Sequence, residues 1–191
     1  MATKSEFSIL GLAHKLCLAA ENQGYNPQRL NDLAEHPDLF RRFLQVQLCL
    51  AEIKPIEHLI DLDANPFTPS GWRVEEHAKG GHFKWNPTQV KLHLSKSQKD
   101  GKVIEGNRLR GELSGKPIFN ANVLDYLLKN PHLIPEEWKG KAVFFWGTIY
   151  RFSDGGLYVR YLCWRGDRWV WSYHWLGSAF CGSNPAVLRA S

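Results

Sequence analysis

The sequence lacks closely spaced cysteine pairs. Its four cysteines stand at positions 17, 49, 163 and 181, and none of them forms a Cys-x-x-Cys motif. This absence excludes a zinc ribbon and a thioredoxin-like redox motif. Isolated cysteines in a chain that is long enough to bury a core are typical of reduced thiols, so we expect a cytoplasmic protein.

Long apolar segments are also absent. No apolar run approaches the roughly 20 residues that a membrane-spanning helix needs. The apolar residues 7–12 are followed by His14 and Lys15, and no clear cleavage site comes after them. We therefore interpret this stretch as an amphipathic helix rather than a secretory signal, and we expect no membrane partner.

Motifs of known catalytic and nucleotide-binding sites are missing as well. The sequence contains no GxSxG, no GxGxxG and no Walker motif, and Ser95-Lys96-Ser97 does not fit the Ser-x-x-Lys pattern of acyl-enzymes. His77, His82 and His93 have a spacing that matches no standard zinc pattern. We predict no catalytic residue, no metal site and no cofactor, and an enzyme without a recognisable motif remains an alternative.

The positive charge is concentrated in one part of the chain. The net charge is +5, and residues 1–72 are net acidic whereas residues 73–117 and 118–191 are net basic. Lys96, Lys99 and Lys102 form a basic stretch, with Arg108 and Arg110 close behind them. Such a stretch is either a solvated loop or a place where phosphate groups bind by counterion release.

Two regions differ in their residue patterns. In residues 1–64, apolar residues recur at helical spacing, which predicts a small helical region. Residues 61–88 contain four turn-forming Pro and Gly clusters and read as irregular, so we place a domain boundary between residues 64 and 65. The region 65–191 begins with a basic, largely irregular middle part, which includes a strand over 90–94, and continues with a helix over 120–130.

The last third of the chain predicts a β-meander. Residues 143–151, 157–164 and 169–175 read as strands, and the dipeptides Asp154-Gly155 and Gly166-Asp167 suit two-residue hairpin turns. We therefore predict a three-stranded antiparallel, Trp-rich meander within residues 142–176. Together with the preceding helices, this makes the chain an α+β protein.

The two turns fix the predicted register of the meander. The second turn places Trp164 opposite Trp169 and Tyr158 opposite Trp175, and the first places Arg151 opposite Tyr158. One face then holds two arginines among six aromatic residues, and its members are Arg151, Arg160, Tyr158, Trp164, Trp169, Trp171, Tyr173 and Trp175.

Several motifs between residue 65 and the end of the chain resemble hypothetical proteins of bacterial genomes, of the kind found in small-genome candidate phyla. The most specific is Phe144-Phe145-Trp146-Gly147-Thr148-Ile149-Tyr150-Arg151, followed by the Trp-rich hairpin; Gly71-Trp72 and Leu133-Ile134-Pro135 are further examples. The resemblance covers about two thirds of the chain and implies a bacterial module. It assigns no catalytic or binding residue.

The aromatic face has two interpretations. It can be a cross-strand ladder that stabilises a short sheet, or an exposed platform that binds a partner. Because aromatic and arginine side chains dominate binding hot spots, we predict a small macromolecule-binding module with a protein partner. The alternative is single-stranded nucleic acid, bound by the same face and the basic stretch 96–110. The predicted binding residues are Trp169, Trp171, Tyr173, Trp175, Arg151, Arg160, Lys96, Lys99 and Lys102.

Overall fold

The computed structural model describes residues 9–24, 26–51 and 56–190, and it divides the chain into two compact units, Met1–Ile56 and Glu57–Ser191. The α+β prediction is confirmed, because helices are combined with a mostly antiparallel sheet. The division falls before the expected position between residues 64 and 65. Residues 57–64 belong to the second unit because strand β1 (Leu59–Asp61) pairs there with β3 (His82–Lys84).

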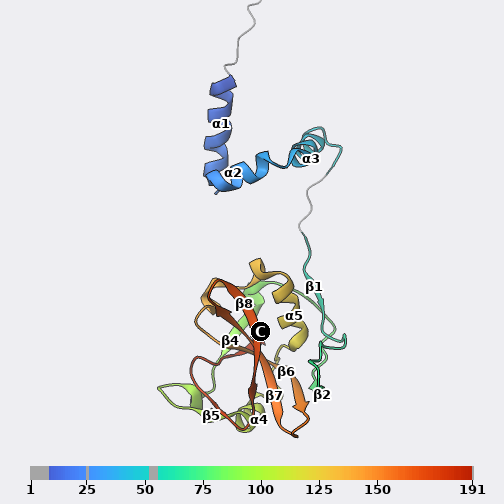
Figure 1. Cartoon of the computed structure of the whole chain (residues 1–191), viewed down its shortest axis with the longest axis vertical. Coiled ribbons are helices and arrows are strands. Elements are labelled where there is room, and N and C mark those ends of the chain that lie inside the picture. The colour runs from blue at the N-terminus through green and yellow to red at the C-terminus, as the bar shows by residue number, and fades with distance from the viewer. Residues whose placement is uncertain (1–8, 25, 52–55, 191) are drawn as a thin grey trace, which may run out of the picture. The chain divides into compact units, whose positions relative to one another are not determined.

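The described residues of the first unit form three helices, α1 (Ile9–Asn22), α2 (Pro27–Ala34) and α3 (Pro37–Gln47) (Figure 1). Proline is the first residue of α2 and α3, a position where its missing N–H costs no helical hydrogen bond. The Asn26 side chain accepts a hydrogen bond from the backbone N–H of Arg29, which caps α2. Within the described residues, no helix combines the length and the apolar character that crossing a bilayer demands.

The second unit is built around a six-stranded sheet in which β6 pairs with three neighbours. The strand order is β4-β10-β6-β7-β8, and β2 pairs with β6 as well. Their bounds are β2 Trp72–His77, β4 Val90–His93, β6 Val143–Phe152, β7 Leu157–Arg165, β8 Arg168–Trp175 and β10 Ala186–Arg189. The three strands that were expected to form a sheet of their own are therefore part of a larger one. The region 61–88, expected to be irregular, supplies β2, β3 and the last residue of β1.

Short elements complete this unit. A second small sheet pairs β5 (Ile104–Glu105) with β9 (Ala179–Phe180). The helices are α4 (Gly106–Leu113) and α5 (Ala121–Lys129), and the 3-10 turns are η1 (Pro87–Gln89), η2 (Lys96–Gln98), η3 (Pro131–Leu133) and η4 (Glu136–Trp138).

Each face of the sheet has its own core. On one face, which we call the α5 face, Leu124 and Leu127 of α5 belong to the same buried cluster as Phe145 and Leu162 of the sheet. On the other, the α4 face, Leu109 of α4 belongs to a second buried cluster that includes Phe144, Trp146 and Val159. Both faces thus remove apolar side chains from water, which stabilises the unit.

A buried polar network fixes the start of α5 against the sheet. The Asn120 side chain caps the helix and donates to the carbonyl of Leu62 at 2.8 Å, and the Thr148 hydroxyl accepts from the backbone N–H of Ala121. The His77 ring is hydrogen-bonded to Thr148 at 2.8 Å and to the Leu62 carbonyl at 3.0 Å. Satisfied buried groups of this kind define one arrangement of the elements that carry them.

The register of the three strands differs in part from the prediction. The pairing of β7 with β8 is the predicted one, with Trp164 opposite Trp169. Between β6 and β7 the turn has three residues, 153–155, instead of two, since the Phe152 N–H donates to the Gly156 carbonyl and Gly155 adopts a φ of 84°. Arg151 therefore lies opposite Leu157 rather than Tyr158. This one-residue slip moves Arg151 to the α4 face, so its predicted face was wrong.

Candidate binding surface

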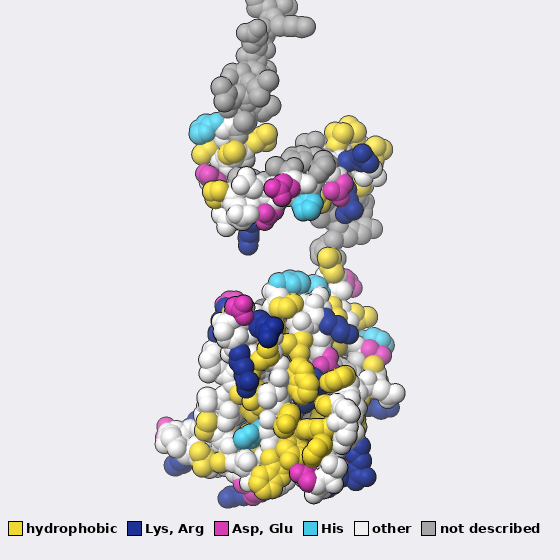
Figure 2. Space-filling view, in the orientation of Figure 1, with side chains coloured by type: hydrophobic (Ala, Val, Ile, Leu, Met, Phe, Trp, Pro, Cys, Tyr) yellow, Lys and Arg dark blue, Asp and Glu magenta, His cyan; other side chains and the backbone are white. Residues whose placement is uncertain are grey.

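Five aromatic residues gather on the α5 face, at the end of the sheet where β2, the β6–β7 turn and the end of β8 meet. We call this set the aromatic patch, and its members are Trp72, Phe152, Tyr158, Tyr173 and Trp175. Phe152 is 37% exposed, Tyr173 49% and Trp175 50%. Figure 2 shows hydrophobic side chains gathered on the surface over the region of β6 and β7.

Trp72 is the centre of this patch. Its ring lies 4.8 Å from that of Tyr173, 5.0 Å from that of Tyr158 and 5.6 Å from that of Phe152, measured between centroids. The contact with Tyr173 is T-shaped, an arrangement that aromatic pairs prefer. Because Trp72 supports several neighbours at once, Tyr173 presents its outer surface in a fixed position.

Trp175 is fixed by its own neighbour along the chain. A Cβ atom at Gly177 would come within 2.4 Å of the Trp175 ring, so the indole packs directly on the glycine backbone. Glycine at position 177 is therefore required for this position of the indole, whose other surface is open to solvent.

The two other predicted aromatic residues of β8 are less accessible. Trp169 is buried and packs against Trp164, with ring centroids 5.4 Å apart. Trp171 is half-buried beneath the Arg160 guanidinium, which lies 4.4 Å from its ring centroid. Towards the start of β8 the aromatic side chains therefore form a stabilising ladder, while Tyr173 and Trp175 at its end are exposed.

Arg160 does not have the exposed position expected for a binding residue. It is 1% exposed, and its guanidinium donates to both carboxylate oxygens of Asp125 on α5, at 3.0 and 2.6 Å. Burial alone would lower the pKa of Arg160, but the hydrogen bonds and charge of Asp125 raise it above its usual value. The expectation of a free arginine at this position was wrong, because the guanidinium holds α5 on the sheet.

Arg151 is also engaged within the molecule. Two of its nitrogens donate to the carboxylate of Glu75 at 2.8 and 2.6 Å, and a third donates to the Gly155 carbonyl. The hydrogen bond from Arg151 lowers the pKa of Glu75, and the pKa of Arg151 is raised in return. A bidentate pair of this geometry leaves little of the guanidinium for a phosphate group.

The three predicted lysines, Lys96, Lys99 and Lys102, are exposed in and just after η2. Lys96, Lys102 and Arg108 line a hollow of about 530 Å³ that contains no member of the aromatic patch. The structure therefore does not bring the basic stretch and the exposed aromatics into one hollow.

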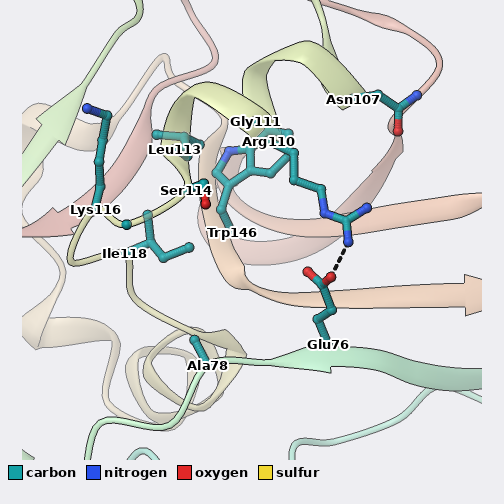
Figure 3. A pocket seen from close by; sticks show the side chains of 11 residues that line it. Glu76, Ala78, Asn107, Arg110, Gly111, Leu113, Ser114, Lys116, Ile118 and Trp146 are labelled. Carbon is teal, nitrogen blue, oxygen red and sulfur yellow. Dashed lines mark hydrogen bonds and ion pairs between the residues drawn. The ribbon is translucent and has the colours of Figure 1, made fainter.

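A hollow of about 560 Å³ lies beside α4 (Figure 3). Glu76 and Arg110 form an ion pair on one side of it, while Ser114 and Lys116 line the opposite side. The indole of Trp146 forms part of the wall, and its buried N–H has no partner among the described residues. The lining contains no histidine or cysteine, and its one carboxylate, Glu76, is paired with Arg110.

Two histidines of the second unit, His77 and His174, are held by other groups. The two ring nitrogens of His77 bond to Thr148 and to the Leu62 carbonyl, and Nε2 of His174 is 3.3 Å from the Ala179 carbonyl oxygen. In the described part of the chain, no three His, Cys, Asp or Glu side chains are grouped so that they could hold a metal ion.

No known protein family, curated protein or solved structure matches this chain. The candidate surface therefore depends on geometry alone. Sequence reasoning missed two of its members, Trp72 and Phe152. For Trp72 a signal exists, because Trp72 and Val74 alternate with the charged Arg73 and Glu75, as is typical of a half-buried strand.

Proposed function

We propose that this chain is a small bacterial module that binds another protein through the aromatic patch. The observation that carries the proposal is the fixed, half-exposed position of Tyr173 and Trp175. In this proposal the sheet unit is the binding domain, the N-terminal helices form a separate region, and the module acts in the cytoplasm.

The exposed area of the two rings is large enough to support binding. Tyrosine and tryptophan present about 150–250 Å² when fully exposed, so a half-exposed ring leaves about 100 Å² to cover. At about 25 cal/mol per Å², covering Tyr173 and Trp175 contributes on the order of 5 kcal/mol before the costs of association. Rigid aromatic side chains also lose little conformational entropy on binding, which is why they are frequent in hot spots.

A protein partner is favoured over nucleic acid by the state of the arginines. Single-stranded nucleic acid needs cationic groups beside the stacking rings. Arg160 is buried against Asp125 and Arg151 is paired with Glu75, so neither supplies a free charge to the patch. An apolar segment of a polypeptide needs no such charge.

The experiment is selection of random displayed peptides on the full chain, followed by titration of synthetic copies of the enriched peptides. We expect Tyr173→Ala and Trp175→Ala each to weaken binding at least about tenfold, the range of hot-spot residues. Val103→Ala is the matched control, because Val103 is an exposed apolar residue of the hollow beside Lys102. Failure to enrich any peptide, or equal binding by all three variants, would contradict the proposal.

A parallel titration with fluorescent single-stranded oligonucleotides at low salt addresses the alternative. We expect no saturable binding. Binding that falls steeply with salt and is lost when Lys96, Lys99 and Lys102 are changed to glutamine would instead favour nucleic acid as the partner.

A further inference from the structure

Strand β8 forms the outer edge of the sheet, and half of its backbone groups face away from β7. Its N–H and C=O groups bond to β7 at every second residue, and Leu176 continues this ladder by donating to the Leu157 carbonyl at 2.8 Å. In antiparallel pairing the bonding residues alternate, so the even-numbered residues bond to β7 and the odd-numbered ones face outwards. The outward N–H and C=O groups of Trp171 and Tyr173 have no partner in the described part of the chain.

This edge lacks the features that normally protect an exposed strand. Edge strands are commonly blocked by proline, by lysine or by a charge that points inwards. β8 has eight residues without proline, lysine or carboxylate, and its one charged side chain, Arg168, stands at its first position. A strand of this composition is a template for a further strand.

The side chains beside the edge define what that further strand would carry. On the α5 face the edge is lined by Tyr173 and Trp175, which favour apolar side chains. On the α4 face Arg168 lies opposite Arg165 of β7, and both are exposed. Two like charges placed directly opposite each other repel, and a carboxylate of the added strand beside Arg168 would offset this repulsion.

Resting on the proposed function, we propose that β8 binds an extended segment of another protein as an added strand, with apolar residues on the α5 face and acidic residues on the α4 face. Main-chain hydrogen bonds to Trp171 and Tyr173 hold the segment, and alternate side chains provide specificity, as in other cases of strand addition. Strands β7 and β8 contain three arginines and no carboxylate. A second copy of the chain is therefore a poor occupant, because its own β8 brings no acidic group.

The decisive comparison is Tyr173→Pro against Tyr173→Ala, with a synthetic copy of the most enriched displayed peptide as the probe. Both variants remove the ring, but only proline removes the outward N–H. Because this N–H makes no bond to β7, proline is tolerated at an edge of this kind. One backbone hydrogen bond contributes about 0.5–1.5 kcal/mol, so Tyr173→Pro should bind about 2- to 13-fold more weakly than Tyr173→Ala.

A scan of the peptide with N-methylated residues makes the same test without changing the protein. Strand addition predicts weaker binding for N-methylation at every second position and unchanged binding at the positions between. Equal binding of Tyr173→Pro and Tyr173→Ala, with no alternation in the scan, would overturn strand addition. It would leave the proposed function intact if Tyr173→Ala still binds more weakly than the wild type.

Two further measurements test the role of the Arg168 charge and whether a second copy of the chain occupies the β8 edge. Arg168→Glu should weaken a peptide with acidic residues and should not weaken its counterpart with glutamines. Analytical ultracentrifugation of the full chain should give a monomer. A dimer that is lost in Tyr173→Pro and retained in Tyr173→Ala would mean that a second copy occupies the edge, which would overturn the proposed partner.

Discussion

Removing the carboxylate of Asp125 tests the interpretation of Arg160 as a structural residue. In Asp125→Ala the guanidinium of Arg160 loses its two hydrogen bonds of 3.0 and 2.6 Å and stays buried beneath α5. A buried charge without its partner costs about 3–5 kcal/mol. The Asp125 side chain is 23% exposed, so water partly screens the charge, and we expect a loss of about 3 kcal/mol in the free energy of unfolding.

The double variant Asp125→Leu with Arg160→Met separates two quantities. One is the cost of leaving a buried charge without its partner, and the other is the net contribution of the ion pair to stability. It removes both charges and keeps apolar volume beside Trp171, which lies 4.4 Å from the guanidinium. Buried ion pairs replaced by apolar residues are often neutral in stability. We therefore expect the free energy of unfolding of the double variant to lie within about 1 kcal/mol of the wild-type value, and to be clearly higher than that of Asp125→Ala.

Urea denaturation followed by tryptophan fluorescence measures these differences in the right part of the molecule, because all eight tryptophans lie between residues 72 and 175, in the second unit. The matched control is Glu75→Ala, which breaks the more exposed bidentate pair with Arg151 and should cost no more than about 1 kcal/mol. A loss for Asp125→Ala as small as that for Glu75→Ala would mean that the Asp125 carboxylate does not hold Arg160.

Three further outcomes follow from the same contacts. Gly147→Ala should destabilise the unit by about 1–3 kcal/mol in urea denaturation, because its Cβ would come within 2.9 Å of the backbone of Asn120; an unchanged midpoint would contradict this packing. Burial lowers the pKa of His93, so its contribution to stability is present above a pH of about 6.5 and is lost as the pH falls through its folded-state pKa. The free energy of unfolding should therefore fall less between neutral and mildly acidic pH in His93→Gln than in the wild type. Identical pH profiles of the two proteins would refute this contribution of His93. Tyr173→Ala and Trp175→Ala should each shift the thermal midpoint only slightly, since both rings are half-exposed; a large loss would mean that they serve the core instead of a partner.

Local turn chemistry explains which part of the sheet could be predicted. Gly166 has a φ of 63°, as a two-residue turn with glycine first requires, and this turn fixes every pair between β7 and β8. The turn at 153–155 contains one more residue than predicted, because Gly155 occupies a third, left-handed position. That one residue moved Arg151 to the other face of the sheet, where it lies opposite Leu157.

The α+β class, the alternation of β8 and the concentration of tryptophan at the C-terminal hairpin follow from local patterns of residues. Which rings water reaches depends on long-range packing, because alternation assigns side chains to a face without showing what covers it. Asp125 comes from α5 to hold Arg160, Trp72 comes from β2 to support Tyr173, and β10 enters the sheet between β4 and β6. These contacts join residues far apart in the chain, where no local pattern constrains the pairing, and among the aromatic residues of β8 they leave Tyr173 and Trp175 exposed.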